Sequence, residues 1–151
     1  MIISFTGSGS VDMTPEQLQT LRLVLEMIQP DEAHHGDCIH ADAQFHAICQ
    51  HYGIKIVVHP PVNTAYRAWC DGPHTTILEP KPYIPRNHDI VDVGHLLIAG
   101  PHQPEYLRSG TWSTVRYARK QKKQTIILEA HGNIDWELTL QEIEIAIRFW
   151  A

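Results

Sequence analysis

The sequence "HLLIAGPHQPEYLRSGTWSTVRYARKQKKQTIILEA", residues 95–130, contains a strand–helix–strand pattern. It begins and ends with a largely apolar run, and runs of this kind are typical of strands buried on both faces. Between them, a polar segment leads into a basic helix that we predict from about Thr111 to Lys123. A strand, a helix and a second strand in this order predict a right-handed crossover between parallel strands.

The same alternation extends over the rest of the chain. Thr14 and Gln17 have the spacing of a capping box, Pro15 occupies the first helical position, and Pro30 ends that helix. The other elements expected upstream are a strand at residues 2–5, a very short strand and a helix within 32–53, a strand at 54–59 and a short helix at 86–94. Ala43, Ala47 and Ile48 are predicted to form the buried side of the helix within 32–53.

About five strands alternating with helices predict an α/β protein with a Rossmann-like three-layer fold, in which helices flank a mainly parallel five-stranded sheet. The length fits one domain over residues 1–151. Residues 59–85 hold six of the ten prolines and predict a long loop that serves as a lid or as one wall of a pocket. Thr139 and Glu142 predict a capping box at the start of the last helix. The residues expected on its apolar side are Ile143, Ala146, Ile147 and Trp150.

Composition narrows the class of protein. A hydrophobic content of 43% supports a real core, and a net charge of -5 argues against a general attraction to nucleic acid or to anionic membranes. The basic run at residues 116–123 is predicted to be a solvated helix face. Three unevenly spaced cysteines do not form a disulfide framework, and no apolar run is long enough to span a bilayer. We therefore expect a cytoplasmic protein without a signal peptide.

The strongest candidate site is "RSGTWST", residues 108–114, at the start of the basic helix. A helix N-terminus leaves backbone N–H groups unpaired and carries a partial positive charge. Gly110 lets the backbone approach an oxyanion, the hydroxyls of Ser109, Thr111 and Thr114 can donate, and Arg108 adds a formal charge. An ordinary N-cap would explain one of these hydroxyls, so the set favours phosphate binding.

Two further segments are predicted at the same carboxyl edge of the sheet as this one. The first is the turn after the first strand, with Thr6, Gly7, Ser8 and Gly9. The second is a loop–helix junction with Gly36, Asp37 and Asp42. A separate candidate is the pair Arg86 and Asn87, which begins a helix; Arg86 can pair with a phosphate or remain a surface arginine, and Asn87 can read a base or cap the helix.

The segment from His34 to Cys49 is rich in histidine and cysteine, but its spacing matches no zinc pattern. We predict no metal and no resident cofactor. Tyr66, Trp69 and Tyr83 lie in the proline-rich loop, where they can stack on a base. Trp112 is expected to pack under its helix, and Trp136 and Trp150 to lie in the core or an interface.

Together these motifs resemble the SLOG superfamily of Rossmann-like nucleotide-binding proteins. The resemblance rests on "FTGS", "HGDCIHADA", "PRNHDIVD", "LLIAGP" and "RSGTWSTVRYARK" before "QTIILE", in that order along nearly the whole chain. The superfamily includes the Lonely Guy phosphoribohydrolases, the DNA-processing protein A family and sensor domains for NAD-derived signals, and the likeness is to small single-domain bacterial or phage members. It implies that Gly110 and Thr111 cradle a phosphate, with residues 6–9, residues 37–42 and Arg86 around the same cleft.

One departure from the family pattern affects the predicted activity. Lonely Guy enzymes carry a "PGGxGTxxE" motif whose glutamate serves hydrolysis of an N-glycosidic bond. Here Trp112, Ser113 and Thr114 follow the Gly-Thr pair, so no carboxylate stands at that place, and Arg108-Ser109 replaces the paired glycines.

Three functions stay open on these grounds. The first is binding of a nucleotide or an ADP-ribose-like signal. The second is a hydrolase that cleaves a nucleoside 5'-monophosphate, with Asp42 as the first choice of catalytic carboxylate. Weaker choices of carboxylate are Asp37, Glu79, Glu105 and Glu129. The third is single-stranded nucleic-acid binding, which the acidic charge disfavours. Apolar residues of the last helix, with Phe149 and Trp150, make a homodimer the expected oligomer.

Overall fold

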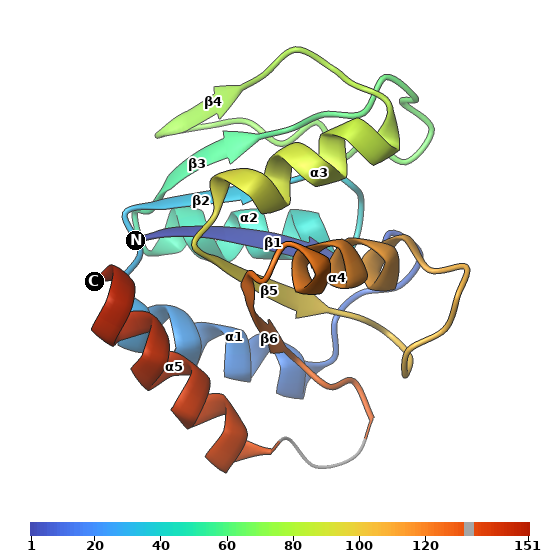
Figure 1. Cartoon of the computed structure of the whole chain (residues 1–151). Helices are drawn as coiled ribbons and strands as arrows, with labels where there is room; N and C mark the ends of the chain where they lie inside the picture. The colour runs from blue at the N-terminus through green and yellow to red at the C-terminus, as the bar shows by residue number, and fades with distance from the viewer. Residues whose placement is uncertain (132–134) are drawn as a thin grey trace.

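A computed structural model describes residues 1–131 and 135–151. In these residues a parallel sheet of six strands has the order β4-β3-β2-β1-β5-β6 (Figure 1). The strands are β1 (Ile2–Gly7), β2 (Glu32–His35), β3 (Lys55–Val58), β4 (Thr75–Ile77), β5 (Leu96–Gly100) and β6 (Gln124–Ile127). The predicted Rossmann-like α/β fold is confirmed, with one strand more than expected.

Helices cover both faces of the sheet, which gives the three predicted layers (Figure 1). Alternate residues of β5 separate the two cores: Leu96 and Ile98 pack on one side, whereas Leu97 and Ala99 pack on the other. The first face carries α1 (Pro15–Ile28), α2 (Ala41–His51) and α5 (Trp136–Trp150). The second face carries α3 (Tyr83–Val93) and α4 (Gly110–Lys120).

The strand order creates a switch point between β1 and β5. From β1 the chain moves outward through β2 and β3, and it then returns to place β5 on the other side of β1. The two central strands pair in register, with Phe5 beside Ile98 and Gly7 beside Gly100. The connections that follow β1 and β5 run in opposite directions along the sheet. A crevice therefore opens beyond the carboxyl ends of these two strands, where α/β proteins bind ligands.

The predicted start of α1 is confirmed and helps to shape that crevice. The Oγ1 atom of Thr14 accepts from the backbone N–H of Gln17 at 3.1 Å, and Oε1 of Gln17 accepts from the N–H of Thr14 at 2.9 Å. The buried amide of Gln17 also donates to the carbonyls of Pro101 and Leu128, each at 2.7 Å. One capping residue therefore ties α1 to the ends of the two strands on that side of the sheet.

The proline-rich segment is less irregular than its sequence suggested. Residues 75–77 form β4, which pairs with β3 through Thr75 beside Ile56 and Ile77 beside Val58. This strand is short and lies exposed at the edge of the sheet. Its sequence therefore lacks the apolar run from which a buried strand can be predicted. The prediction of a structureless segment over residues 59–85, and with it the count of five strands, was wrong.

The last helix begins earlier than predicted. The Oδ1 atom of Asp135 accepts from the N–H of Leu138 at 2.9 Å, which makes Asp135 the N-cap, and Thr139 instead donates its hydroxyl to the Asp135 carbonyl. Asp and Thr are comparable N-caps, and Asp135 lies one turn upstream. Ile143 and Ala146 are buried as expected, whereas Trp136 and Trp150 are 42% and 44% exposed and do not lie in the core.

Two other helices also differ from expectation. In α2 the buried apolar side runs through Phe45, Ile48 and Cys49, while Ala47 is exposed. Helix α3 begins at Tyr83 rather than at Arg86, so Asn87 lies inside the helix and caps nothing. Within the ranges that the structure describes, no helix combines the length and apolar character needed to cross a bilayer.

Candidate functional site

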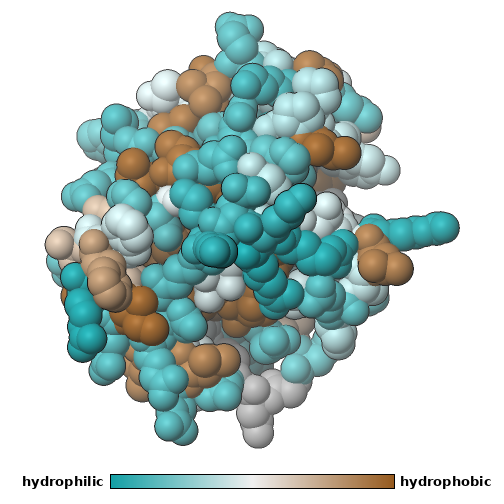
Figure 2. Space-filling view, viewed as in Figure 1, coloured by the Kyte–Doolittle hydropathy of each residue, from teal (hydrophilic) through white to brown (hydrophobic). Residues whose placement is uncertain are grey.

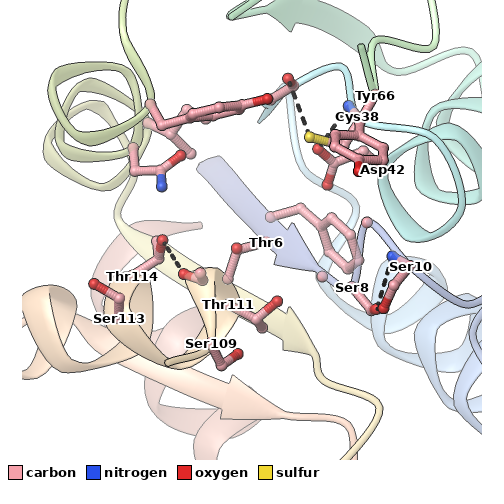
Figure 3. A pocket seen from close by; sticks show the side chains of 18 of the residues that line it. Thr6, Ser8, Ser10, Cys38, Asp42, Tyr66, Ser109, Thr111, Ser113 and Thr114 are labelled. Carbon is pink, nitrogen blue, oxygen red and sulfur yellow. Dashed lines mark hydrogen bonds between the residues drawn. The ribbon is translucent and has the colours of Figure 1, made fainter. Parts of the chain in front are cut away.

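A cavity of about 580 Å³ opens at the switch point between β1 and β5 (Figure 3). The end of β1, the junction before α2, the start of α3 and the loop that leads into α4 contribute its walls. Most of the predicted site residues line it, whereas Asp37, Trp69 and the weaker choices of carboxylate do not. The lining includes Thr6, Gly7, Ser8, Gly9, Gly36, Cys38, Asp42, Tyr66, Tyr83, Ile84, Arg86, Asn87, His102, Tyr106, Arg108, Ser109, Gly110, Thr111, Ser113 and Thr114.

The N-terminus of α4 presents free backbone donors to this cavity. Ser109 is the N-cap, and its Oγ accepts from the N–H of Trp112 at 3.2 Å. Among the described residues, the N–H groups of Gly110 and Thr111 have no hydrogen-bond partner. The Thr114 hydroxyl donates to the Gly110 carbonyl at 2.9 Å, so it serves the helix rather than a ligand. Two N–H groups at a helix start form an anion site.

Space and charge at this helix start also suit an anion. A Cβ atom placed on Gly110 would meet nothing within 4 Å, so the helix opens directly into the cavity there. Arg108, one residue before the cap, is exposed and lines the same cavity. Trp112 is 4% exposed and packs beneath the helix, as predicted.

The turn after β1 shapes the cavity floor. A Cβ atom on Gly7 would lie 2.5 Å from Cβ of Ala41, so only glycine lets this strand end approach α2. The Ser8 Oγ accepts from the N–H groups of Ser10 and Val11, at 3.1 and 3.3 Å, and is occupied with closing the turn. In the part of the chain described, the Thr6 hydroxyl makes no hydrogen bond, which leaves it available to a ligand.

Asp42 lies on the opposite wall of the cavity, at the start of α2 (Figure 3). Its side chain is buried, and Oδ2 accepts from the N–H of Cys38 at 3.1 Å, whereas Oδ1 has no partner among the described residues. Burial raises the pKa of this carboxyl to about 6, against the opposing effect of the Arg86 charge. Burial likewise raises the pKa of the Cys38 thiol to about 11, so that thiol stays protonated at neutral pH.

Arg86 has a structural task as well as a place on the cavity wall. Its Nη1 donates to the carbonyls of Gly36 and His59, and its Nε donates to Oδ1 of Asn87 at 2.8 Å. A Cβ atom on Gly36 would meet the guanidinium at 2.8 Å and Asp42 Oδ2 at 3.2 Å. Glycine at this position therefore lets Arg86 fasten the ends of β2 and β3 beside the carboxylate.

Asp37, predicted as a ligand contact, faces away from the cavity. Its carboxylate is fully buried, where it accepts from Nε of Arg67 at 2.8 Å and from the N–H of Cys70 at 2.8 Å. Its carbonyl accepts from the N–H of Ala68 at 2.8 Å. Asp37 thus anchors the proline-rich segment to the end of β2, and it is no part of the cavity lining.

The histidine-rich segment brings His35, His46 and Cys70 within 4.8 Å of one another, a spacing that a metal ion could use. The hydrogen bonds specify another role. His46 Nε2 bonds the Asp71 carbonyl and must donate, so His46 Nδ1 accepts from His35 Nε2 at 2.9 Å. His35 Nδ1 in turn accepts from the N–H of Asp37. Both rings are then neutral with every nitrogen used, and His35 has no free lone pair for a metal.

Aromatic side chains surround the cavity mouth. Tyr66 and Tyr83 line it as predicted, whereas Trp69 does not; its ring lies 3.8 Å from the guanidinium carbon of Arg67. His102 and Tyr106, from the loop between β5 and α4, also line it, and sequence reasoning missed both. Their only signal was a position just before the phosphate motif.

Among the described residues that line the cavity, Asp42 is the only one with a carboxylate. Glu105, one of the weaker catalytic choices, binds Arg116 and Arg119 on the surface of α4 at 3.2 and 3.0 Å. Glu79 and Glu129 do not line the cavity either.

Fold and cavity together define a Rossmann-like α/β protein with a ligand-sized pocket at its switch point. The structure is similar to a molybdenum cofactor binding protein from Rippkaea orientalis, with a TM-score of 0.63 and 18% identity over 97% of this chain and 84% of that one. It is also similar to the Moco carrier protein from Chlamydomonas reinhardtii, with a TM-score of 0.60 and 18% identity over 84% of this chain and 75% of that one.

A third similar structure is DNA processing protein A from Streptococcus pneumoniae, with a TM-score of 0.62 and 12% identity over 99% of this chain and 56% of that one. No protein-family model matches the chain, and neither does any curated protein. These likenesses confirm the Rossmann-like fold that the sequence motifs implied.

Proposed function

We propose that this protein binds a phosphorylated small molecule, a nucleotide or a nucleotide-derived compound such as an ADP-ribose relative, with its phosphate on residues 109–111. The observation that carries this proposal is the pair of unpartnered N–H groups of Gly110 and Thr111 at the cavity wall, in the part of the chain that the structure describes. Arg108 adds a positive charge beside them. A phosphate at this place satisfies backbone donors that otherwise only water can reach.

The similar structures support binding of a small ligand in general. Two of them are proteins that bind or carry the molybdenum cofactor. In this chain the cavity also offers faces on which a planar heterocycle can stack, because Tyr66, Tyr83 and Tyr106 lie on its walls.

A charge placed at Gly110 tests the proposal without harming the fold. Gly110→Asp puts a carboxylate at the first position of α4, where the helix dipole favours it by about 0.3–1 kcal/mol. Its Cβ meets open space, so we expect unchanged or slightly raised thermal stability. Like-charge repulsion should lower the affinity for nucleoside monophosphates at least tenfold, as measured by calorimetry.

Gly110→Asn is the matched control, because it has the same size without the charge. We expect it to weaken binding much less than Gly110→Asp. If both variants bind as the unmodified protein does, the phosphate does not lie on this helix start, and the proposal fails.

A second candidate function is hydrolysis of the N-glycosidic bond of a nucleoside 5'-monophosphate. Asp42 favours it, since a buried carboxylate that lines the cavity can stabilise an oxocarbenium-like centre. Chromatography of nucleoside monophosphates incubated with the protein should then show free base, and Asp42→Asn should abolish its release. Thermal stabilisation by the ligand without any free base would leave binding as the function.

We also propose that the protein is a homodimer through α5. Figure 2 shows apolar side chains gathered over this helix, at the lower left of the molecule. Phe149 is 67% exposed and Leu138 is 54% exposed, and Ile145 adds to the same surface. An exposed apolar helix face of this kind is a typical subunit contact.

A further inference from the structure

The cavity has two chemically different ends (Figure 3). At one end Ser109, Gly110 and Thr111 form the start of α4, which attracts an anion. At the other end Asp42 presents a carboxylate beside Cys38 and below Tyr66. A ligand that fills the cavity must therefore carry a phosphate at one end and hydrogen-bond donors at the other.

The carboxylate of Asp42 has unused acceptor capacity. Its Oδ1 is buried from water and makes no hydrogen bond to any described residue, and Oδ2 accepts an N–H from Cys38. An ionised carboxylate can accept about four hydrogen bonds in one plane. A buried carboxylate with most of these places empty loses free energy that a donor on the ligand would restore.

We propose that Asp42 recognises one edge of a heterocycle, the edge with adjacent ring N–H and exocyclic 2-amino donors that guanine and pterins share. This proposal rests on the proposed function, because the phosphate at residues 109–111 sets the orientation of the ligand. Two parallel N–H donors match the two oxygens of a carboxylate, as bidentate pairs do generally. Adenine offers no such pair of donors, so this inference separates guanine and pterin ligands from adenine ligands.

The surroundings of Asp42 fit a flat heterocycle at that end. Tyr66 and Tyr83 both line the cavity, so a ring has aromatic faces against which it can stack. Arg86 lies beside the same carboxylate, but its Nη1 and Nε already bond Gly36, His59 and Asn87. These bonds hold the guanidinium in place, and among the described residues no ion pair joins it to Asp42.

The test compares GMP, IMP, AMP and XMP by calorimetry at pH 7.5. We expect GMP to bind at least tenfold more tightly than AMP, which is roughly what one bidentate pair contributes to base discrimination. IMP, which lacks the 2-amino group, should fall between them. A pterin monophosphate should also bind more tightly than AMP. Whichever of GMP and the pterin monophosphate binds more tightly identifies the heterocycle that the site prefers.

The variant Asp42→Asn makes the test specific. An asparagine amide donates where the carboxylate accepted, so GMP should lose affinity and XMP, with a carbonyl in place of the amino group, should gain relative to it. Asp31→Asn, on the exposed surface away from the cavity, is the control and should change neither affinity. Equal binding of GMP and AMP to the unmodified protein would overturn the proposal.

If Asp42 instead contacts the ribose of the ligand, the affinities change in a different way, and the proposal for the heterocycle edge is also overturned. In that case deoxy-GMP binds more weakly than GMP, and Asp42→Asn removes the difference without any gain for XMP. Both of these failures leave phosphate binding intact, which Gly110→Asp tests separately. If no phosphorylated compound binds at all, the proposed function fails first.

Discussion

Replacing Asp42 by asparagine should stabilise the protein while weakening its ligand binding. Burial raises the pKa of Asp42 from 3.8 to about 6, so the folded protein holds this proton more tightly than the unfolded chain does. The proton bound to Asp42 stabilises the folded state. This stabilisation is fully present below pH 3.8 and is lost as the pH rises through about 6. Asparagine carries no charge at any pH and avoids this loss.

The size of the effect follows from the shift. The pKa values of Asp42 in the folded and unfolded states differ by about two, and each pKa unit corresponds to roughly 1.4 kcal/mol. Asp42→Asn should therefore raise the free energy of unfolding by at most about 3 kcal/mol at pH 7.5. For a domain of this size that amounts to a rise in melting temperature of about 6–12 °C. Near pH 4 the folded carboxyl is protonated, and the gain should fall to about 0.5 kcal/mol.

Thermal unfolding of the unmodified protein and Asp42→Asn from pH 4 to pH 8 measures this gain directly. Asp31→Asn is the control of opposite sign, because the N-terminal ammonium holds the pKa of Asp31 below its usual value, and the variant should gain nothing at neutral pH. If Asp42→Asn has the same relative stability at pH 4 and pH 7.5, the carboxylate is not held in a costly buried state.

Three further predictions concern the frame around the cavity. Gly7→Ala should cost about 1–3 kcal/mol in urea unfolding, because its Cβ would lie 2.5 Å from that of Ala41; no cost would mean that β1 and α2 separate freely. Arg67→Met should cost about 3–5 kcal/mol, because it leaves the carboxylate of Asp37 buried without its cation; a cost below about 1 kcal/mol would refute that role. Phe149→Lys should convert the dimer to a monomer in light scattering, and an unmodified protein that is already monomeric would contradict the proposed interface.

Much of the fold and part of the site could be predicted because their signals are local. Buried strands such as residues 95–100 are continuous apolar runs, and the capping box of Thr14 and Gln17 involves residues three apart. The start of α4 also lies within a few consecutive residues. These features depend little on distant parts of the chain, so sequence patterns identify them.

The features that were missed depend on contacts between distant residues. Asp37 and Asp42 lie five positions apart, yet Asp37 turns away because its φ of 61° redirects the chain and Arg67 receives its carboxylate. Strand β4 exists only because β3 offers it a partner. His102 reaches the cavity from an irregular loop, and no periodicity marks such a position.

The proposed function depends on a phosphate at the N-terminus of α4. A crystal structure of the protein with GMP, or with another ligand that stabilises it, would show where the phosphate lies. We expect phosphate oxygens within hydrogen-bond distance of the N–H groups of Gly110 and Thr111, with the heterocycle toward Asp42. A phosphate bound elsewhere, with the start of α4 facing only solvent, would contradict the proposed function.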